Sequence, residues 1–509
     1  MRSKNAFKNI LFYLIYEVFS FALGIIFPRF IIAVYGSEVN GLISTVTRAL
    51  ALINLIQAGA VGAAIFQMYK PVADNDYETQ SSIIYSSKRF YHKVTIIFTF
   101  GAVAIGVFYS IYLQSNDLQW WEILLSFLIL TINGVMALMV TSICDIYLSP
   151  HQKKYYLILS QFANIVVHYG LLTIVLLLKL PPVYIFISIL FGGCANAVLN
   201  LVFYKKFSKN KINQSPINKL YVIPDRKYLM FQCIGEEAMT AAPTIIITTF
   251  LGLSLSSVFS IYFLVFSSIK TILSSIQLSF SAIFGNLVKT SDDKKVYKVY
   301  NCIELATFLL GIMSAGCVGF LIMPFVKIYT ANVADIDYIY PLLGVFTTVF
   351  VVIFTFRTSF GYVATVYGLF KKTCFITLVC SGVGIITSVL CVLFFGMPYA
   401  MIGLLANELI ASIATIAVLK RSVPWFRIDK LFMRTSLLIV VTVASLISYY
   451  SWNPQINSFL QWAGFALALI AIIVFILSIY CVIFERNEIK MLFNYVRALF
   501  SKRSKREEI

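Results

Sequence analysis

The sequence predicts an all-α polytopic membrane protein with fourteen transmembrane helices and both termini in the cytoplasm. Its 509 residues are 60% hydrophobic and only 12% charged, and the mean hydropathy is +0.87. Soluble domains are about 45–50% apolar and about 25% charged, so this composition excludes a water-soluble enzyme. A membrane helix needs about 20 apolar residues, and the chain is therefore long enough for a dozen or more spans.

Fourteen apolar runs separated by polar turns define the predicted spans. They cover residues 9–33, 42–66, 92–112, 122–147, 155–178, 183–203, 229–251, 256–283, 301–326, 339–367, 373–395, 399–419, 434–450 and 459–484. An even number of spans places both termini on one side of the membrane, and the distribution of basic residues identifies that side.

The basic residues lie almost entirely on one side of this map. Of the 40 Lys and Arg, only Lys179 and Lys327 fall in predicted outer loops, and four more fall inside spans. The rest lie in the N-terminal segment, the inner loops or the C-terminal tail. Cytoplasmic segments are enriched in Lys and Arg, so the termini are predicted to be cytoplasmic. Topology and a tail suited to anionic lipids explain the net charge of +18 without nucleic-acid binding.

A polar, basic stretch divides the chain into repeated halves, an arrangement that is common in transporters. The predicted parts are an N-terminal six-helix lobe (1–203), a basic cytoplasmic linker (204–227), a C-terminal six-helix lobe (228–420), a C-terminal helix pair (421–484) and a basic cytoplasmic tail (485–509). The halves share a faint repeat. Pro28 and then Gly36 close the first span, and Pro243 and then Gly252 close the seventh.

Four cations lie inside predicted spans, where a charge costs about 2.5–3.5 kcal/mol on insertion scales. Arg29 and Arg48 lie toward the outer ends of the first two spans, whereas Lys270 and Arg357 lie deeper in the eighth and tenth. Snorkelling to the outer interface explains Arg29 and Arg48 as well as a cavity does. The depth of Lys270 and Arg357 favours a wet cavity. We predict that these four residues bind substrate.

Acidic residues inside spans are candidates for ion coupling. Glu17 lies in the first span, and Glu236 and Glu237 lie in the seventh. Neighbouring side chains point about 100° apart on a helix, so at least one of the latter two is expected to pair or to be protonated. A structural ion pair and a proton or sodium site fit this pattern equally well. Further span acids are Glu408 and, near inner ends, Asp145 and Glu304.

No metal, cofactor or catalytic centre is predicted. The nine Cys include no Cys-x-x-Cys pair and the chain has three His, so metal-ligand spacing is absent. A membrane-embedded glycosyltransferase or polymerase, the rival from another class, needs sizeable outer loops that carry acids. Most predicted outer loops here are short, and the first carries only Glu38. We therefore expect no enzyme.

The first 90 residues carry a recognisable set of motifs. These are Pro28-Arg29, Tyr35-Gly36-Ser37-Glu38-Val39-Asn40-Gly41-Leu42, Gln57-Ala58-Gly59, Tyr69-Lys70-Pro71 and Asp76-Tyr77. The set resembles the start of bacterial polysaccharide flippases of the multidrug/oligosaccharidyl-lipid/polysaccharide export superfamily. These proteins move undecaprenyl-diphosphate-linked O-antigen, capsule or related repeat units. Beyond these residues the resemblance is architectural.

The resemblance implies an alternating-access cavity between two lobes and a multi-pass location in the bacterial cytoplasmic membrane. Related lipid II flippases carry cavity-facing cations on helices 1, 2 and 8, which Arg29, Arg48 and Lys270 match, although a Lys in span 8 departs from the Arg expected there. The last two helices are implied to accommodate the polyprenyl tail. We predict a flippase for an undecaprenyl-diphosphate-linked oligosaccharide, with membrane lipids and a proton or sodium counter-ion as partners. The alternatives are a lipid II flippase and a cation-coupled multidrug exporter.

Overall fold

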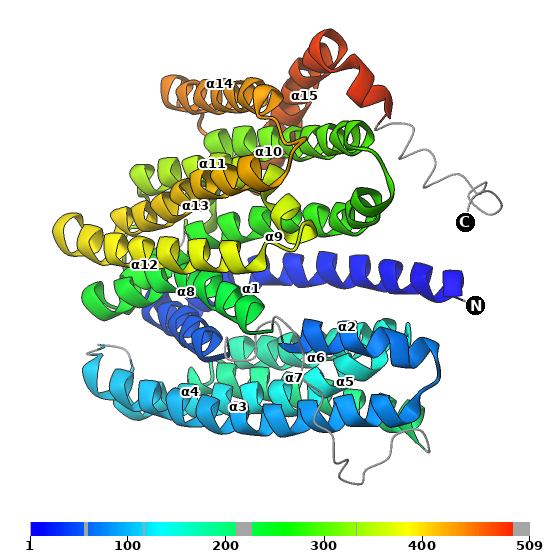
Figure 1. The fold of residues 1–509 in the computed structure, drawn as a ribbon. Coiled ribbons are helices and arrows are strands. Elements are labelled where there is room, and N and C mark those ends of the chain that lie inside the picture. The colour runs from blue at the N-terminus through cyan, green and yellow to red at the C-terminus, as the bar shows by residue number, and fades with distance from the viewer. Residues whose placement is uncertain are drawn as a thin grey trace. The chain divides into compact units, whose positions relative to one another are not determined.

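The computed structural model describes residues 2–54, 60–113, 115, 118–209, 226–331 and 333–491. All regular structure in these residues is helical, and this confirms the all-α prediction (Figure 1). The α-helices are α1 (Arg2–Asn54), α2 (Ala60–Ala73), α3 (Tyr77–Tyr112), α4 (Trp120–Met136), α5 (Ser142–Leu148), α6 (Lys154–Leu177), α7 (Val183–Ser208), α8 (Arg226–Leu251), α9 (Leu253–Thr290), α10 (Asp293–Tyr329), α11 (Pro341–Val366), α12 (Phe370–Phe395), α13 (Ala400–Ser422), α14 (Asp429–Trp452) and α15 (Phe459–Phe484). A π-helical turn, Ala137–Thr141, joins α4 to α5, and a 3₁₀ turn, Met397–Tyr399, precedes α13.

Helices occupy the described part of each predicted span, apart from one or two terminal residues. Twelve segments of the described chain are long and apolar enough to cross a membrane. One of them, Ile15–Ile53, contains residues 15–33 of the first predicted span and residues 42–53 of the second. Helix α8, the predicted seventh span, is not among the twelve, because Glu236 and Glu237 lower its mean hydropathy. The cytoplasmic location of the termini stays a prediction.

The chain folds into two compact units. Unit 1 comprises Met1–Ser260 and Asn332–Ile336, and unit 2 comprises Ile261–Ala331 and Asp337–Ile509. The predicted lobes, helix pair and tail stay predictions. Residues 210–225 of the linker and 492–509 of the tail lie outside the described residues.

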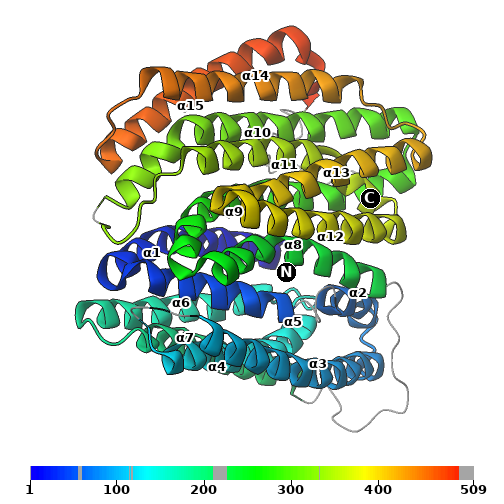
Figure 2. The same ribbon diagram turned by 90° about the vertical axis from the view of Figure 1, so that its left-hand side faces the viewer.

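In unit 1, α1 packs against α6 and α8, α3 packs against α4, and α7 packs against α4 and α6 (Figure 2). The helices approach closely where small residues face large ones. A Cβ atom added at Gly106 would lie 2.8 Å from Phe127, and one at Gly134 would lie 2.4 Å from Phe98. Close approach of this kind stabilises helix contacts in a membrane. Apolar side chains are as well accommodated by lipid chains as by another helix, so burial of apolar surface alone does not hold the helices together.

In unit 2, α10 is the central helix. It contacts α11, α14 and α15, while α12 packs against α13 and α13 against α11. The side chains of α10 are buried over most of its length, and Gly316 and Gly319 admit the side chains of α14 and α15. The C-terminal helices are thus packed onto α10 rather than standing apart.

The predicted proline and glycine repeat corresponds to two breaks in helices. Gly36 interrupts α1 with φ 81° and ψ 178°, and Gly252 separates α8 from α9 with φ 94°. Positive φ is accessible to glycine without steric cost. Pro28 and Pro243 lie inside the preceding helices. The helix therefore changes direction at the glycine in each case, and both breaks belong to unit 1.

Candidate substrate and coupling sites

The break at Gly36 is fastened by hydrogen bonds from the motif that surrounds it. The Ser37 amide and hydroxyl donate to the two carboxylate oxygens of Asp335 at 2.6 and 2.9 Å. The Tyr35 hydroxyl donates to the main-chain carbonyl oxygens of Val175 and Leu180 at 3.2 and 2.6 Å. These bonds give the second half of α1 a capped start, since a carboxylate satisfies the amide that the break exposes.

Beyond the break, α1 is joined to α8 and α9 by polar side chains inside unit 1. The Asn40 amide donates to the Ser257 hydroxyl at 2.8 Å, and the hydroxyls of Thr45 and Thr248 lie 2.7 Å apart. Gly41 lets the helices come this close, because a Cβ atom there would lie 2.0 Å from a carbonyl oxygen of α9. The motif residues 35–41 thus have a structural explanation. They build the contact between the two helix breaks.

Arg48 and Glu237, predicted for different roles, influence each other. Arg48 lies on α1 beyond Thr45 and is half-buried, and Glu237 on α8 acts electrostatically on its guanidinium group. Burial disfavours the charged form of Arg48, and the opposite charge of Glu237, which is exposed, favours it. Unit 1 thus combines a predicted substrate cation with a predicted coupling acid.

The other predicted residues of unit 1 lie in different surroundings. Arg29 is half-buried in the first half of α1. Glu17, also half-buried on α1, interacts with the hydroxyl group of Tyr13 one turn away. Glu236 is exposed on α8 and accepts a hydrogen bond of 3.3 Å from the Gln232 amide.

Among the predicted residues of unit 2, Arg357 is held in an ion pair. Its guanidinium donates to Glu408 on α13 at 2.8 Å, and the two side chains are only 20% and 10% exposed. The Asn407 amide donates to the other oxygen of Glu408 at 3.3 Å. The pair ties α11 to α13, and a part for Arg357 in substrate binding stays a prediction. Lys270 is half-buried on α9.

The most deeply buried charges of unit 2 were not predicted as a group. Arg434, the first residue of the thirteenth predicted span, is 1% exposed, and its partners Glu304 and Glu485 are 0% exposed. The guanidinium lies 3.0 Å from Glu304 and donates to both oxygens of Glu485 at 2.9 and 3.0 Å. One cation thus joins α14, α10 and the end of α15.

Lys430 extends this network toward the surface. Its ammonium group lies 3.2 Å from Glu485 and 2.5 Å from Glu488. Burial by itself disfavours the Glu488 carboxylate, but the hydrogen bond and the charge of Lys430 outweigh burial and lower the pKa of Glu488. One feature of the sequence could have revealed this network: its charges lie at or beside the predicted inner ends of three different spans. Because each span was considered separately, most of these charges were assigned to loops.

No known sequence family and no curated protein matches the chain. Solved structures do match it. The lipid II flippase MurJ in an inward closed conformation aligns with a TM-score of 0.63 and 16% identity, covering 93% of this chain and 99% of the flippase. An inward-facing multidrug resistance MATE family transporter of the MOP superfamily aligns with a TM-score of 0.61 and 13% identity, covering 84% of this chain and 96% of the transporter. The eukaryotic MATE transporter AtDTX14 aligns with a TM-score of 0.52 and 15% identity, covering 87% of this chain and 97% of that transporter.

The fold is that of MOP-superfamily transporters. At these identities the likeness concerns the fold, and it agrees with the superfamily that residues 28–77 resemble. Of those residues, 35–41 form the helix break and the polar contact of unit 1, whereas the motif Gln57-Ala58-Gly59 lies outside the described residues. The polysaccharide flippase subtype stays a prediction.

Proposed function

We propose that this protein is a flippase that moves undecaprenyl-diphosphate-linked oligosaccharide repeat units from the inner to the outer leaflet of the bacterial cytoplasmic membrane by alternating access. The observation that carries the proposal is the structural match to a lipid II flippase over 93% of this chain. The multidrug transporter matches 84%. A flippase for a lipid-linked sugar thus accounts for more of the chain than an exporter of small drugs.

The charges inside the helices support an anionic substrate. A lipid diphosphate needs cations in a partly dry site, and charge-assisted hydrogen bonds to phosphate are stronger there than neutral ones. We assign Arg29, Arg48 and Lys270 to this role. Guanidinium groups hold phosphate oxygens through two donors, whereas the Lys270 ammonium acts as a point charge. Arg357 takes part only if phosphate replaces Glu408, its present partner.

The proximity of Glu237 to Arg48 suggests how the carrier handles its charge when it is empty. In the proposed cycle, the negative charge of Glu237 neutralises Arg48 in the absence of substrate. When the diphosphate binds Arg48, a proton or a sodium ion binds the Glu237 carboxylate instead. Glu17 and Glu236 are the other candidates for this coupling. Replacing each acid by Gln and measuring transport against an imposed pH or sodium gradient tests it. Unchanged gradient dependence in all three variants assigns them to structure.

Export in cells tests the substrate cations. Replacing Arg48 or Lys270 by Ala is expected to abolish export of the lipid-linked sugar while the protein stays in the membrane, and Lys270→Arg is expected to be tolerated. The matched control is Lys327→Ala, which removes an exposed cation at the end of α10. Normal export by Arg48→Ala and Lys270→Ala at wild-type abundance overturns the assignment.

The alternatives within the same fold are distinguished by substrate. A lipid II flippase is expected to move lipid II in preference to other lipid-linked glycans. A cation-coupled multidrug exporter is expected to confer drug resistance that depends on the acids rather than on Arg48 and Lys270. A membrane-embedded glycosyltransferase or polymerase is expected to change the glycan covalently, whereas the proposed flippase leaves it unchanged.

A further inference from the structure

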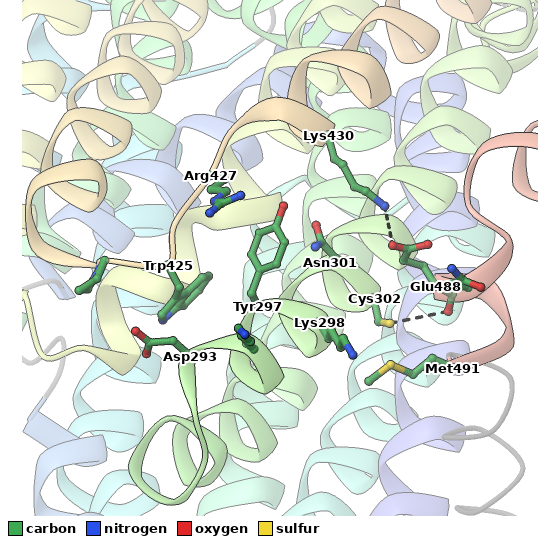
Figure 3. A pocket seen from close by; sticks show the side chains of 13 residues that line it. Asp293, Tyr297, Lys298, Asn301, Cys302, Trp425, Arg427, Lys430, Glu488 and Met491 are labelled. Carbon is green, nitrogen blue, oxygen red and sulfur yellow. Dashed lines mark hydrogen bonds and ion pairs between the residues drawn. The ribbon is translucent and has the colours of Figure 1, made fainter.

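A cavity of about 840 Å³ lies at the predicted inner end of unit 2 (Figure 3). Its walls come from the first turns of α10, the loop before α14 with the first turn of that helix, and the segment that follows α15. The volume is within the range of about 300–1,000 Å³ that is typical of small-ligand sites. None of the residues predicted to bind substrate or coupling ions lines it.

The cavity has an excess of positive charge. Four basic and two acidic side chains line it, and one acid, Glu488, is already paired with Lys430. The remaining cations are Lys294, Lys298 and Arg427, which are exposed at the cavity and form no ion pair within the described ranges. Three cations against the single carboxylate of Asp293 create a positive potential that attracts anions.

A buried amide adds a neutral donor to these cations. Asn301 lines the cavity although it is only 4% exposed, and its side chain makes no hydrogen bond to any residue that the structure describes. It follows Lys294 and Lys298 at helical spacing, so the three share one face of α10. A ligand oxygen in the cavity is a suitable acceptor for this amide.

Two aromatic rings also line the cavity. Trp425, 6% exposed, precedes Arg427 in the loop, and Tyr297 lies next to Lys298 on α10 (Figure 3). Aromatic rings beside cations are typical of the membrane–water interface. Basic pockets between membrane helices on the cytoplasmic side are suited to lipid phosphates.

We propose that this cavity binds the phosphate group of an anionic ligand, with Lys298 and Arg427 as the charged contacts and Asn301 as a neutral donor. Its position favours the headgroup of an anionic phospholipid of the inner leaflet. Free phosphate from the cytosol offers the same chemistry. The site is separate from the residues assigned to transport, and the inference does not depend on the proposed function.

The test compares lipid binding to the purified full-length protein by native mass spectrometry. Phosphatidylglycerol is expected to remain bound to the wild type about thirtyfold more than to Lys298→Gln/Arg427→Gln, since the variant loses two basic residues that each contribute about 1 kcal/mol near a lipid phosphate. Phosphatidylcholine is expected to show no such difference. Inorganic phosphate, added in a thermal-shift measurement, tests the soluble source. Stabilisation of the wild type alone by phosphate, without a difference in lipid retention, assigns the site to a soluble anion.

The matched control is Lys420→Gln/Arg421→Gln, which removes two exposed cations from the last turn of α13, outside the cavity. Lys298→Arg/Arg427→Lys keeps the charge and is expected to retain the lipid. Arg427→Gln alone, at an exposed loop position, replaces the double variant if that variant does not fold. Equal retention and equal stabilisation in the wild type and the cavity variant overturn the proposal. An equal loss in the control also overturns it, since surface charge alone then explains binding.

Discussion

Replacing Arg434 by Met probes the buried network that joins α10, α14 and the end of α15. Arg434 is 1% exposed and contacts Glu304 and Glu485 at 2.9–3.0 Å. Methionine has a similar length but leaves Glu304 buried without a cation and leaves Glu485 with Lys430 alone. Breaking a buried ion pair by removing one partner costs about 3–5 kcal/mol. We expect the free energy of unfolding to fall by about this amount.

Unfolding by SDS in mixed micelles, followed by circular dichroism, measures this change. Arg434→Met/Glu304→Gln/Glu485→Gln removes the stranded charges and is expected to recover most of the loss, because a neutral buried cluster needs no counter-charge. Arg421→Met, at an exposed position, is the control and is expected to change stability by less than about 0.5 kcal/mol. An Arg434→Met variant as stable as the wild type refutes the claim that this network holds the C-terminal helices on α10.

Three further predictions concern packing, pairing and topology. Gly41→Ala is expected to destabilise the protein by about 1–3 kcal/mol in the same SDS assay, because the added methyl group would lie 2.0 Å from a carbonyl oxygen of α9 and forces the helices apart. Arg357→Gln and Glu408→Gln are each expected to lower the thermal midpoint, and the double variant to lower it less than their sum, since each single change strands one partially buried charge. A single Cys at position 457 is expected to react with an impermeant reagent from outside, and one at position 291 only after permeabilisation. Outside labelling at position 291 contradicts the predicted topology.

The helices could be predicted from the sequence because each is long, apolar and bounded by polar turns. The break at Gly36 was also within reach, since a proline and a glycine near the end of an apolar run indicate that the helix changes direction. The role of residues 35–41 could not be derived in this way. Ser37 bonds to Asp335, almost 300 residues later in the chain, and such a contact leaves no local pattern.

The buried charges show the same limit. Arg434 is the first residue of an apolar run, and the charge count therefore grouped it with the preceding inner loop. Its burial depends on two acids from other helices at the same depth, Glu304 and Glu485. Arg357 was recognised as a charge inside a helix, but its partner Glu408 could not be chosen from several acids by sequence alone. Pairwise contacts between helices decide which charges are structural.

Transport of a defined undecaprenyl-diphosphate-linked oligosaccharide by the purified protein in liposomes is the most direct test of the central claim. Outward movement of two negative charges is favoured by about 4–5 kcal/mol per 100 mV when the inside is negative, so the cations need only to hold the diphosphate during passage. The account predicts that the wild type moves the lipid-linked sugar between leaflets and that Arg48→Ala and Lys270→Ala do not, although both insert normally. Movement at the wild-type rate in both variants, or no movement in the wild type, contradicts it.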